Sequence, residues 1–372
     1  MLMHSPGRFL LSCLGIAFAV VIMFLQMGFF NGLNDSQANL PPILDADLIM
    51  SHKEKNHLKS GEDFSLKRMQ QALGIEEVIS ATHLYANANY WWNPQNGSRN
   101  RVLILAVSIE NPGLKVPEIE IYKKVLKKPH TILFDQLSRK ELGNVQVGTQ
   151  VKLGVDTVEV VGLFNLGANF TYEGHIITSH ENYYKIFAHK DPDKLVDLIS
   201  LGLLKLKQDA NPVLVKEKLL SKLPNDFIVL TREEIESREK VYTTKSSPAG
   251  IIFGIGLIVA LIIGIIICYQ ILFNEINDHL GQFATLKAIG HKANFIFSIV
   301  VYEALFLALI GFIPGLLASY VLFYIVEHFT QIIMFLTPVR IIIIFALTVI
   351  MTQLSAALAI KKVISTDPAD LF

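Results

Sequence analysis

Four long apolar runs alternate with polar sequence along the chain. They cover Phe9–Phe30, Ala249–Phe273, roughly Phe295–Val326 and Ile341–Ile360. About 20 apolar helical residues are needed to cross about 30 Å of hydrocarbon, so each run predicts a transmembrane helix. The first run is longer than the apolar core of about 7–15 residues in a signal peptide, and no small-residue cleavage site follows it. We therefore expect an uncleaved anchor, preceded by a short N-terminus, over residues 1–30.

The polar region between the first two runs, residues 31–247, has the pattern of a domain with both strands and helices. It begins with a strand "ADLIM", a helix "DFSLKRMQQALG" that Asp63 or Ser65 caps and Gly74 ends, and a strand "VISATHLYANANYWW". The same order returns near its end, where Asn211 caps a helix that has Pro212 at its first position. These patterns predict two β-α-β units that fold together.

A β-rich insert separates the two predicted units, which cover 31–95 and 196–230. The insert, 96–195, contains strand-like runs such as "RVLILAV", "HTILF" and "HIITS". Its turn or bulge points are Gly148, Gly154 and Gly162. The fold class expected is therefore an α+β membrane protein, with four transmembrane helices and a large α/β domain between the first two.

A polar helix, 231–247, connects this domain to the second apolar run. It opens with "TREE", in which Thr231 and Glu234 have the spacing of a capping box. Two acid–base pairs follow at i,i+4 spacing, which supports an exposed helix. We interpret the segment as a stalk that carries motion between domain and membrane. Its candidate residues are Glu234 with Arg238 and Glu236 with Lys240.

Composition and charge agree with a membrane protein. The chain is 51% hydrophobic with a mean hydropathy of +0.42, too apolar for an ordinary soluble protein of 372 residues. Residues 31–247 hold 27 basic and 27 acidic side chains, whereas the other 155 residues hold six of each. The net charge of zero argues against nucleic-acid binding, which needs a basic face. The two cysteines, Cys13 and Cys268, fall inside apolar runs, so they predict no disulfide in the polar domain.

Basic residues near the span ends predict the orientation, because they are retained in the cytoplasm. One set of ends carries Arg8, Lys287, Lys292, Lys361 and Lys362. The other set carries Arg340 alone. We therefore expect a multi-pass membrane protein with both termini in the cytoplasm and residues 31–247 on the other side of the membrane.

Motifs of catalysis are missing from the sequence. It contains no GxxxxGK[ST], GxSxG, HExxH or CxxC, so ATP hydrolysis on this chain is not expected. His175, His180 and His189 have spacings that match no usual metal site. We accordingly predict no catalytic residue, cofactor or metal on this chain.

An amphipathic decapeptide, "GQFATLKAIG", lies between the second and third apolar runs. Apolar residues recur at three-residue steps while Gln282, Thr285 and Lys287 point elsewhere, which predicts a helix within 279–290. One interpretation places its apolar side in lipid and Lys287 against headgroups. The other is a coupling helix in a groove of a cytoplasmic ATPase. The candidate coupling residues are Leu280, Phe283, Leu286, Lys287, Ile289 and Gly290.

Several residues inside the runs are candidates for helix packing. Glu303 is an acidic residue well inside the third run, where a charge should face protein or water, either by hydration near the cytoplasmic end or through a polar contact. Pairs of glycines four residues apart permit close helix approach, and a proline should bend the third helix. These packing candidates are Gly250, Gly254, Glu303, Gly311, Pro314 and Gly315.

The segment "YQILFNEINDHLGQFATLKAIGHKANFI" resembles the stretch after the second span of FtsX-like permeases, and most closely the DevC family. Further stretches similar to that family are "GIAFAVVIMFLQMGFFNGL", "LDADLIM", "QALGIEEV", "LFDQLSRKELG", "SSPAGIIFGIG", "EALFLALIGFIPG" and "STDPADLF". The chain departs from the family in its short N-terminal segment and in Gln282, where an acidic residue is common.

The resemblance implies the membrane subunit of a MacB-like (type VII) ABC transporter, with an FtsX-like permease domain over 248–372. It implies porter-like subdomains at 31–95 and 196–230 and a Sabre-like lobe at 96–195. The implied partners are a second copy of this chain, a DevA-like ATPase that holds ATP and Mg, a DevB-like periplasmic adaptor and a TolC-like outer-membrane channel.

We therefore expect a non-catalytic permease subunit that exports a lipid-like or amphiphilic substrate by mechanotransmission. Two alternatives keep the same fold: an FtsX-like regulator of a periplasmic hydrolase, and a LolC/LolE-like subunit for lipoprotein release. A membrane-anchored periplasmic enzyme would need a reactive cluster of side chains, which the sequence does not indicate.

Overall fold

The structure is a computed structural model that describes residues 6–37, 39–55, 57–58, 62–169, 171–187, 197–245, 247–330 and 334–364. The chain divides into two compact units, which are described separately. One is Met1–Gly32 with Pro248–Phe372, and the other is Leu33–Ser247.

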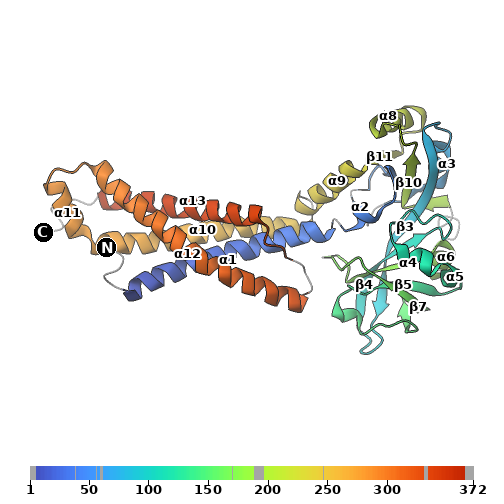
Figure 1. Ribbon diagram of the computed structural model, residues 1–372, viewed down its shortest axis with the longest axis horizontal. Coiled ribbons are helices and arrows are strands. Elements are labelled where there is room, and N and C mark those ends of the chain that lie inside the picture. The colour runs from blue at the N-terminus through green and yellow to red at the C-terminus, as the bar shows by residue number, and fades with distance from the viewer. Residues whose placement is uncertain are drawn as a thin grey trace. The chain divides into compact units, whose positions relative to one another are not determined.

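The first unit is a bundle of helices (Figure 1). Its members are α1 (Pro6–Gln37), α10 (Pro248–Asp278), α11 (Leu280–Ala288), α12 (Ala293–Thr330) and α13 (Pro338–Ile364). Four helices of the described chain are long and apolar enough to cross a membrane, which confirms the four predicted spans. α12 is continuous through Pro314, and at 1.5 Å per residue it is about 57 Å long, which exceeds the hydrocarbon thickness.

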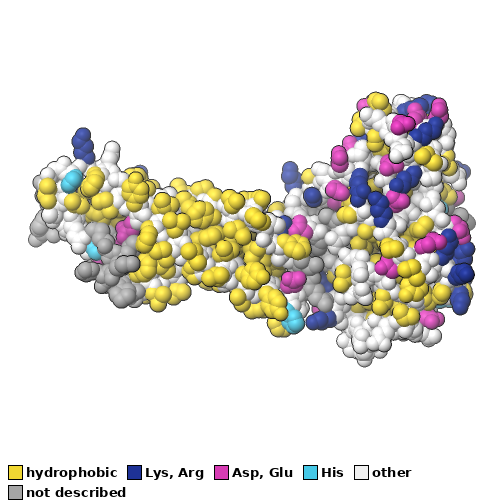
Figure 2. Space-filling model, viewed as in Figure 1, with side chains coloured by type: hydrophobic (Ala, Val, Ile, Leu, Met, Phe, Trp, Pro, Cys, Tyr) yellow, Lys and Arg dark blue, Asp and Glu magenta, His cyan; other side chains and the backbone are white. Residues whose placement is uncertain are grey.

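The bundle is apolar inside and outside. Its buried core includes Val20, Met23, Val300 and Ile344, while large side chains such as Ile258, Leu317 and Tyr320 are exposed. In Figure 2 hydrophobic side chains cover most of these helices, whereas charged side chains are scattered over the 33–247 unit. A surface of this composition is stable in lipid rather than in water.

The 33–247 unit contains a nine-stranded sheet in the order β11-β1-β10-β3-β4-β8-β5-β7-β6. Its first half is built from β1 (Leu48–His52), β3 (Val78–Trp92), β10 (Leu201–Leu206) and β11 (Phe227–Thr231). The helices between these strands are α3 (Leu66–Ala72), which follows the short β2 (Phe64–Ser65), and α8 (Pro212–Lys222). The short β9 (Leu198–Ile199) pairs with β2.

The two predicted β-α-β units interleave. β1 lies between β10 and β11, and β10 lies between β1 and β3, with antiparallel pairing throughout. This is the split β-α-β arrangement. The predicted caps form, because the side chains of Ser65 and Asn211 accept hydrogen bonds from the backbone N–H of Lys67 and Val213.

The second half of the sheet is a small closed barrel. Its strands are β4 (Arg99–Val107), β5 (Thr131–Asp135), β6 (Gln150–Leu153), β7 (Asp156–Phe164) and β8 (Gly174–Ser179). The helices around it are α4 (Pro117–Ile121), α5 (Lys123–Leu126), α6 (His180–Ile186) and the short η2 (Lys140–Leu142). The ring closes where Trp91 of β3 pairs with Leu153 of β6, so the long strand β3 belongs to both halves.

Two further helices flank the sheet: α2 (Leu40–Ile43) and α9 (Arg232–Lys245). Separate apolar cores cover the two faces, one with Tyr85, Trp91 and Ile104 and the other with Leu84, Leu105 and Ile235. The predicted fold class is confirmed: a mixed α+β chain has four apolar helices and a large β-rich domain between the first two.

Candidate functional site

The predicted coupling segment forms a short helix, α11, between α10 and α12. Its end is defined by Gly290, which has a φ of +100°. The N–H of Gly290 donates to the Lys287 carbonyl and the N–H of His291 donates to the Leu286 carbonyl, both at 3.1 Å. This is the Schellman pattern, which needs a residue that tolerates the left-handed region. A glycine at position 290 therefore allows the chain to turn into α12.

The predicted apolar stripe of α11 is divided between the bundle and the exterior. Phe283 is 6% exposed and belongs to the buried core of the bundle, and Leu286 packs partly buried against that core. Leu280 is half-buried, whereas Lys287 is exposed and Ile289 is 72% exposed. The stripe thus has one part that fixes α11 to the transmembrane helices and one part that is accessible to another molecule.

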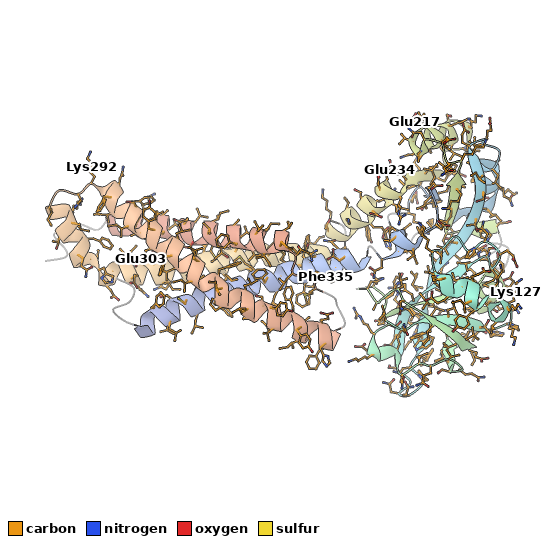
Figure 3. The ribbon with its side chains drawn as sticks, in the orientation of Figure 1. Lys127, Glu217, Glu234, Lys292, Glu303 and Phe335 are labelled. Carbon is orange, nitrogen blue, oxygen red and sulfur yellow. The ribbon has the colours of Figure 1, made fainter. Side chains whose placement is uncertain are left out.

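Glu303 lies on α12, ten residues after its first residue Ala293, and is half-buried (Figure 3). Across from it, on α10, Glu275 interacts with its charge. Glu275 is also paired with His279, with 3.5 Å between His279 Nε2 and Glu275 Oε1. Glu303 is therefore partly covered by protein and lies near enough to Glu275 for their charges to interact.

Gly311 and Gly315 bring α12 close to α1. A Cβ at Gly311 would lie 2.7 Å from Cγ2 of Ile16, and one at Gly315 would lie 2.7 Å from Cγ1 of Val20. Side chains at these positions would push the two helices apart. Gly254 differs, because a Cβ there would meet only Phe30 at 3.8 Å, an ordinary contact, and Gly250 is buried.

Two glycines that the spacing rule does not select make closer contacts on α10. A Cβ at Gly256 would lie 2.4 Å from Oε1 of Gln26, and one at Gly264 would lie 2.1 Å from Sδ of Met351. They are eight residues apart, so a search for pairs four apart passes over them. Gln26 is a polar residue inside the first apolar run, and this could have indicated that the backbone of another helix approaches its side chain closely.

The stalk helix α9 begins with the predicted capping box. The N–H of Thr231 donates to Oε2 of Glu234 at 2.9 Å, and the N–H of Glu234 donates to Oγ1 of Thr231 at 3.3 Å. The stalk residues do not form the ion pairs expected at i,i+4 spacing, and Glu234, Arg238 and Glu236 contact other residues instead. Glu234 (Figure 3) pairs at 2.6 Å with Lys216 of α8. Burial raises the pKa of Glu234, but the Lys216 ammonium and the capping N–H of Thr231 together outweigh burial and hold this pKa below its ordinary value.

The other stalk residues have different partners too. Arg238 Nη2 donates to the backbone carbonyl of Lys55 at 2.8 Å, and Glu236 lies 3.8 Å from Nε of Arg232. Lys240 is exposed. Sequence reasoning missed Glu239, which is 3% exposed and accepts a hydrogen bond at 2.6 Å from the N–H of Leu58. α9 is therefore attached to its own domain at several points along its length.

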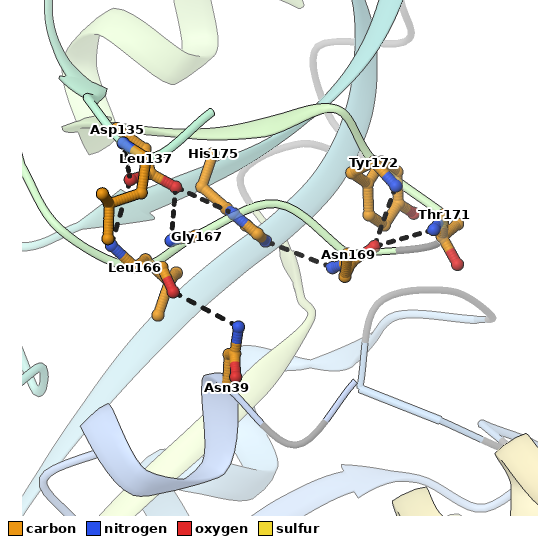
Figure 4. Close-up of polar contacts among 9 residues, drawn as sticks. All are labelled: Asn39, Asp135, Leu137, Leu166, Gly167, Asn169, Thr171, Tyr172 and His175. Carbon is orange, nitrogen blue, oxygen red and sulfur yellow. Dashed lines mark hydrogen bonds and ion pairs between the residues drawn. The ribbon is translucent and has the colours of Figure 1, made fainter. Parts of the chain in front are cut away.

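The histidines considered as metal ligands have structural partners. His175 Nδ1 lies 3.4 Å from Oδ2 of Asp135 and its Nε2 lies 3.4 Å from Nδ2 of Asn169. Asp135 also accepts hydrogen bonds from the N–H groups of Leu166 and Gly167 (Figure 4). This network fixes the loop after β7. His189 lies outside the described residues.

His180, the other candidate, lies in the aromatic cluster at the start of α6. Its ring stacks on His83 with 4.1 Å between ring centroids, and its Nε2 lies 3.2 Å from the His83 carbonyl oxygen. Burial lowers the pKa of His180 to about 3, with a further contribution from His83. Within the described residues no group of three His, Cys, Asp or Glu side chains has the arrangement of a metal site.

Comparisons with known proteins found a family match in the helical unit and weak likenesses to solved structures. No curated protein matches the chain. Part of the chain is similar to the periplasmic region of MacB from Actinobacillus actinomycetemcomitans, at 9% identity over 52% of this chain and 92% of that one, with a TM-score of 0.37. Part is also similar to the extracellular domain of the noncanonic ABC-type transporter YknZ from Gram-positive bacteria, at 10% identity over 50% of this chain and 99% of that one, with a TM-score of 0.33. Likeness at these scores carries no conclusion about function.

The family comparison is more informative. Residues 254–368 match the family described as FtsX-like permease C-terminal, a range that includes α11, α12, α13 and most of α10. Members of this family are non-catalytic transmembrane subunits that generally work with an ATPase partner. Residues 254–368 are thus similar to FtsX-like permease domains, and this similarity supports an ABC-type transmembrane subunit.

Proposed function

We propose that this chain is the membrane subunit of a tripartite ABC exporter of the DevC kind, and that it works as a lever. Two copies of the chain pair with two DevA-like ATPase subunits, which bind ATP and Mg on the cytoplasmic side. Both termini lie in the cytoplasm, and residues 31–247 project from the bacterial inner membrane into the periplasm. There the domain meets a DevB-like adaptor and a TolC-like channel.

The observation that carries the proposal is that α11 is fixed by a buried side chain, whereas its C-terminal end, which we call the accessible side, is exposed. Phe283 fixes the helix in the bundle core, while Lys287 and Ile289 are open to a partner. A partner that grips the accessible side moves α11, and the buried Phe283 transmits this displacement to the helices around it because packed interiors deform little. An interfacial helix that rests in lipid would instead place its largest apolar side chain in the headgroup region.

The attachment of α9 supports the second half of the lever. Glu234, Arg238 and Glu239 tie α9 to other parts of its own domain, and α10 follows it in the chain after Ser247. A movement of α10 is then passed to α9, and from α9 to the domain, because these contacts keep α9 from sliding over the domain. The work comes from nucleotide binding on the partner ATPase, so the chain needs no catalytic residue. The substrate, a lipid-like or amphiphilic molecule, is expelled through the adaptor and channel.

The proposal is tested by the ATPase rate of the purified complex. Ile289→Asp places a charge on the accessible side of α11, and we expect it to reduce stimulation of the ATPase about tenfold, as loss of an interface anchor worth about 1.4 kcal/mol would. Ile121→Asp is the matched control, because Ile121 on α4 is also 72% exposed. Normal stimulation with Ile289→Asp would contradict the proposal.

A second pair of measurements separates the exporter from proteins of the same fold with other tasks. A periplasmic adaptor that copurifies with the chain supports export, whereas a hydrolase in its place identifies an FtsX-like regulator. Accumulation of lipoproteins in the inner membrane after depletion identifies a LolC/LolE-like subunit. These outcomes concern the periplasmic partner, so they are independent of the result with Ile289→Asp.

A further inference from the structure

The outer wall of the barrel carries cations that are held by aromatic rings. Arg99 lies over the ring of Tyr90, with 3.4 Å between Cζ and the ring centroid. Arg101 lies over Tyr172 at 5.2 Å, and Lys152 Nζ lies over Trp92 at 5.1 Å. Contacts of this kind orient a cation without neutralising it. We call the three cations Arg99, Arg101 and Lys152 the ring-held cations.

The ring-held cations have no carboxylate within 4.0 Å among the residues that the structure describes. All three side chains are exposed. Glu173, which precedes β8, uses Oε2 to accept a hydrogen bond from the backbone N–H of Arg101. Other exposed lysines in this unit, such as Lys127 and Lys207, have an acidic partner instead. Three cations without an ion pair to any described residue therefore lie on β4 and β6, two strands that pair with β3 in this wall.

The strand register places the ring-held cations in a grid. Arg99 pairs with Trp92 across β3 and β4, and the Trp91–Leu153 pair places Lys152 on the other side of Trp92. Arg99 and Arg101 are alternate residues of β4, so their Cα atoms are about 6.7 Å apart, and two strand spacings separate Arg99 from Lys152 by about 10 Å. The cations thus have fixed separations along and across the strands.

The end of this wall is rigid. The β3–β4 turn is tied to the loop after β5, because Asn93 Nδ2 donates to the Glu141 carbonyl at 2.9 Å and Gln95 Nε2 donates to the Asn144 carbonyl at 2.9 Å. Asn100 Nδ2 donates to the Glu141 carbonyl as well, at 2.9 Å. Ligand contacts made from such a surface cost little ordering of the protein.

From these observations we infer that the outer wall of the barrel binds an acidic protein segment in an extended conformation, with carboxylates at alternate positions. Carboxylates on alternate residues of an extended peptide have the same spacing of about 6.7 Å as Arg99 and Arg101. The guanidinium groups present planar pairs of N–H donors, which suit carboxylates. Lys152 then meets a third acidic side chain or the end of the segment.

Other anions fit this wall less well. An anionic bilayer offers mobile charges with no fixed spacing, and membrane-surface segments bring apolar side chains to insert, whereas the turn between Asn93 and Ser98 is polar. A small phosphate is better bound in a concave site, and the ring-held cations lie on the outside of a closed barrel. The inference concerns a surface remote in sequence from α11, so it stands apart from the ATPase contact.

The test measures peptide binding to the full-length protein in detergent by fluorescence anisotropy. The probe is a labelled peptide in which Glu alternates with Ser, and its comparison is an isomer in which the same Glu residues form one block. We expect the alternating peptide to bind several-fold more tightly, and the binding to weaken with salt. The triple variant Arg99→Gln, Arg101→Gln, Lys152→Gln should bind it about tenfold more weakly, since each exposed ion pair contributes modestly and three are lost together.

The matched control removes the same charge elsewhere. Lys124→Gln, Lys128→Gln, Lys222→Gln changes three exposed lysines and should leave the affinity within twofold of wild type. Tyr90→Ala, which removes the ring under Arg99, should weaken binding, while Tyr90→Phe should not. Equal affinity for the two peptides, equal loss in the control, or no binding by the wild type would overturn the inference. So would stronger, cation-dependent binding to phosphatidylglycerol vesicles, which would identify a membrane surface instead.

Discussion

Glu239 of α9 accepts a hydrogen bond from the backbone N–H of Leu58, with 2.6 Å between Oε1 and the nitrogen. Both residues are buried, with Glu239 3% exposed and Leu58 3% exposed. A buried donor that loses its acceptor costs about 1–3 kcal/mol. This contact therefore holds a central part of the stalk helix against the domain.

We predict that Glu239→Ala loosens α9. Without the carboxylate the Leu58 N–H has lost this acceptor, so α9 separates from the domain more often. Hydrogen exchange of α9 amides should become faster, by a factor that corresponds to about 1–3 kcal/mol. Glu239→Gln retains an acceptor oxygen and should give a smaller effect. Unchanged exchange in Glu239→Ala would show that other contacts hold the stalk.

The seam between α1 and α12 gives a second prediction. A Cβ at Gly315 would come within 2.7 Å of Val20 Cγ1 and 3.0 Å of the Ala17 carbonyl oxygen, so Gly315→Ala should destabilise the bundle by about 1–3 kcal/mol. Gly254→Ala meets only Phe30, at 3.8 Å, and should be neutral or stabilising because Ala favours the helix.

This difference can be measured by thermal unfolding with a thiol-reactive dye. Cys13 and Cys268 are free and buried in the bundle, so their labelling reports its opening. Gly315→Ala should lower the midpoint and Gly254→Ala should not. Similar midpoints for the two variants would mean that α1 and α12 do not meet closely at this seam.

Acid should weaken the 33–247 unit through His180. The pKa of His180 is about 3 because burial disfavours its charged form, against an ordinary value of 6.5. Since the unfolded state then binds more protons below pH 6.5, the contribution of His180 to stability is present above that pH and decreases as the pH falls toward 3. At pH 5 the loss is about 2 kcal/mol. Burial lowers the pKa of His83 too, in the same direction.

Denaturant titrations of wild type and His180→Gln, followed by the fluorescence of Trp91 and Trp92, measure this loss. Carboxylates titrate in both proteins, so the comparison isolates the histidine. We expect the wild type to lose about 2 kcal/mol more than His180→Gln between pH 7.5 and pH 5. Parallel losses in the two proteins would show that His180 is not held neutral by its surroundings.

The two sides of α11 should have separable roles. Phe283→Ala removes a core side chain, a change that costs about 3–5 kcal/mol in well-packed interiors, while the accessible side with Ile289 is retained. We expect the variant to bind the ATPase subunit with near-normal affinity but to stimulate it weakly. Loss of binding, measured by size-exclusion chromatography of the complex, would instead place Phe283 in the interface.

Local patterns predicted much of the fold. The four apolar helices depend on hydropathy within each segment, and the caps at Ser65, Asn211 and Thr231 depend on a few neighbouring residues. Closure of the barrel could not be predicted in the same way, because it rests on pairing between Trp91 and Leu153, which are distant in the chain.

The candidate sites were harder to predict for the same reason. Glu234 pairs with Lys216 of another helix rather than with Arg238 one turn away. The i,i+4 spacing considers only residues of the same helix, so it cannot identify a partner that the fold brings in from elsewhere. In α11 the periodicity indicated one apolar face, and it could not show that Phe283 is covered by the bundle while Ile289 is exposed. Hydropathy alone does not distinguish an apolar residue that packs internally from one that is free for a partner.

The central claim, that α11 is gripped by a cytoplasmic ATPase, is tested most directly by crosslinking from Ile289. A photoreactive amino acid at this position, in membranes that contain the complete complex, should form an adduct with the ATPase subunit, and the same label at the equally exposed Ile121 should not. ATP binding should change the yield at Ile289. Adducts with lipid alone, or with a periplasmic protein, would contradict the account.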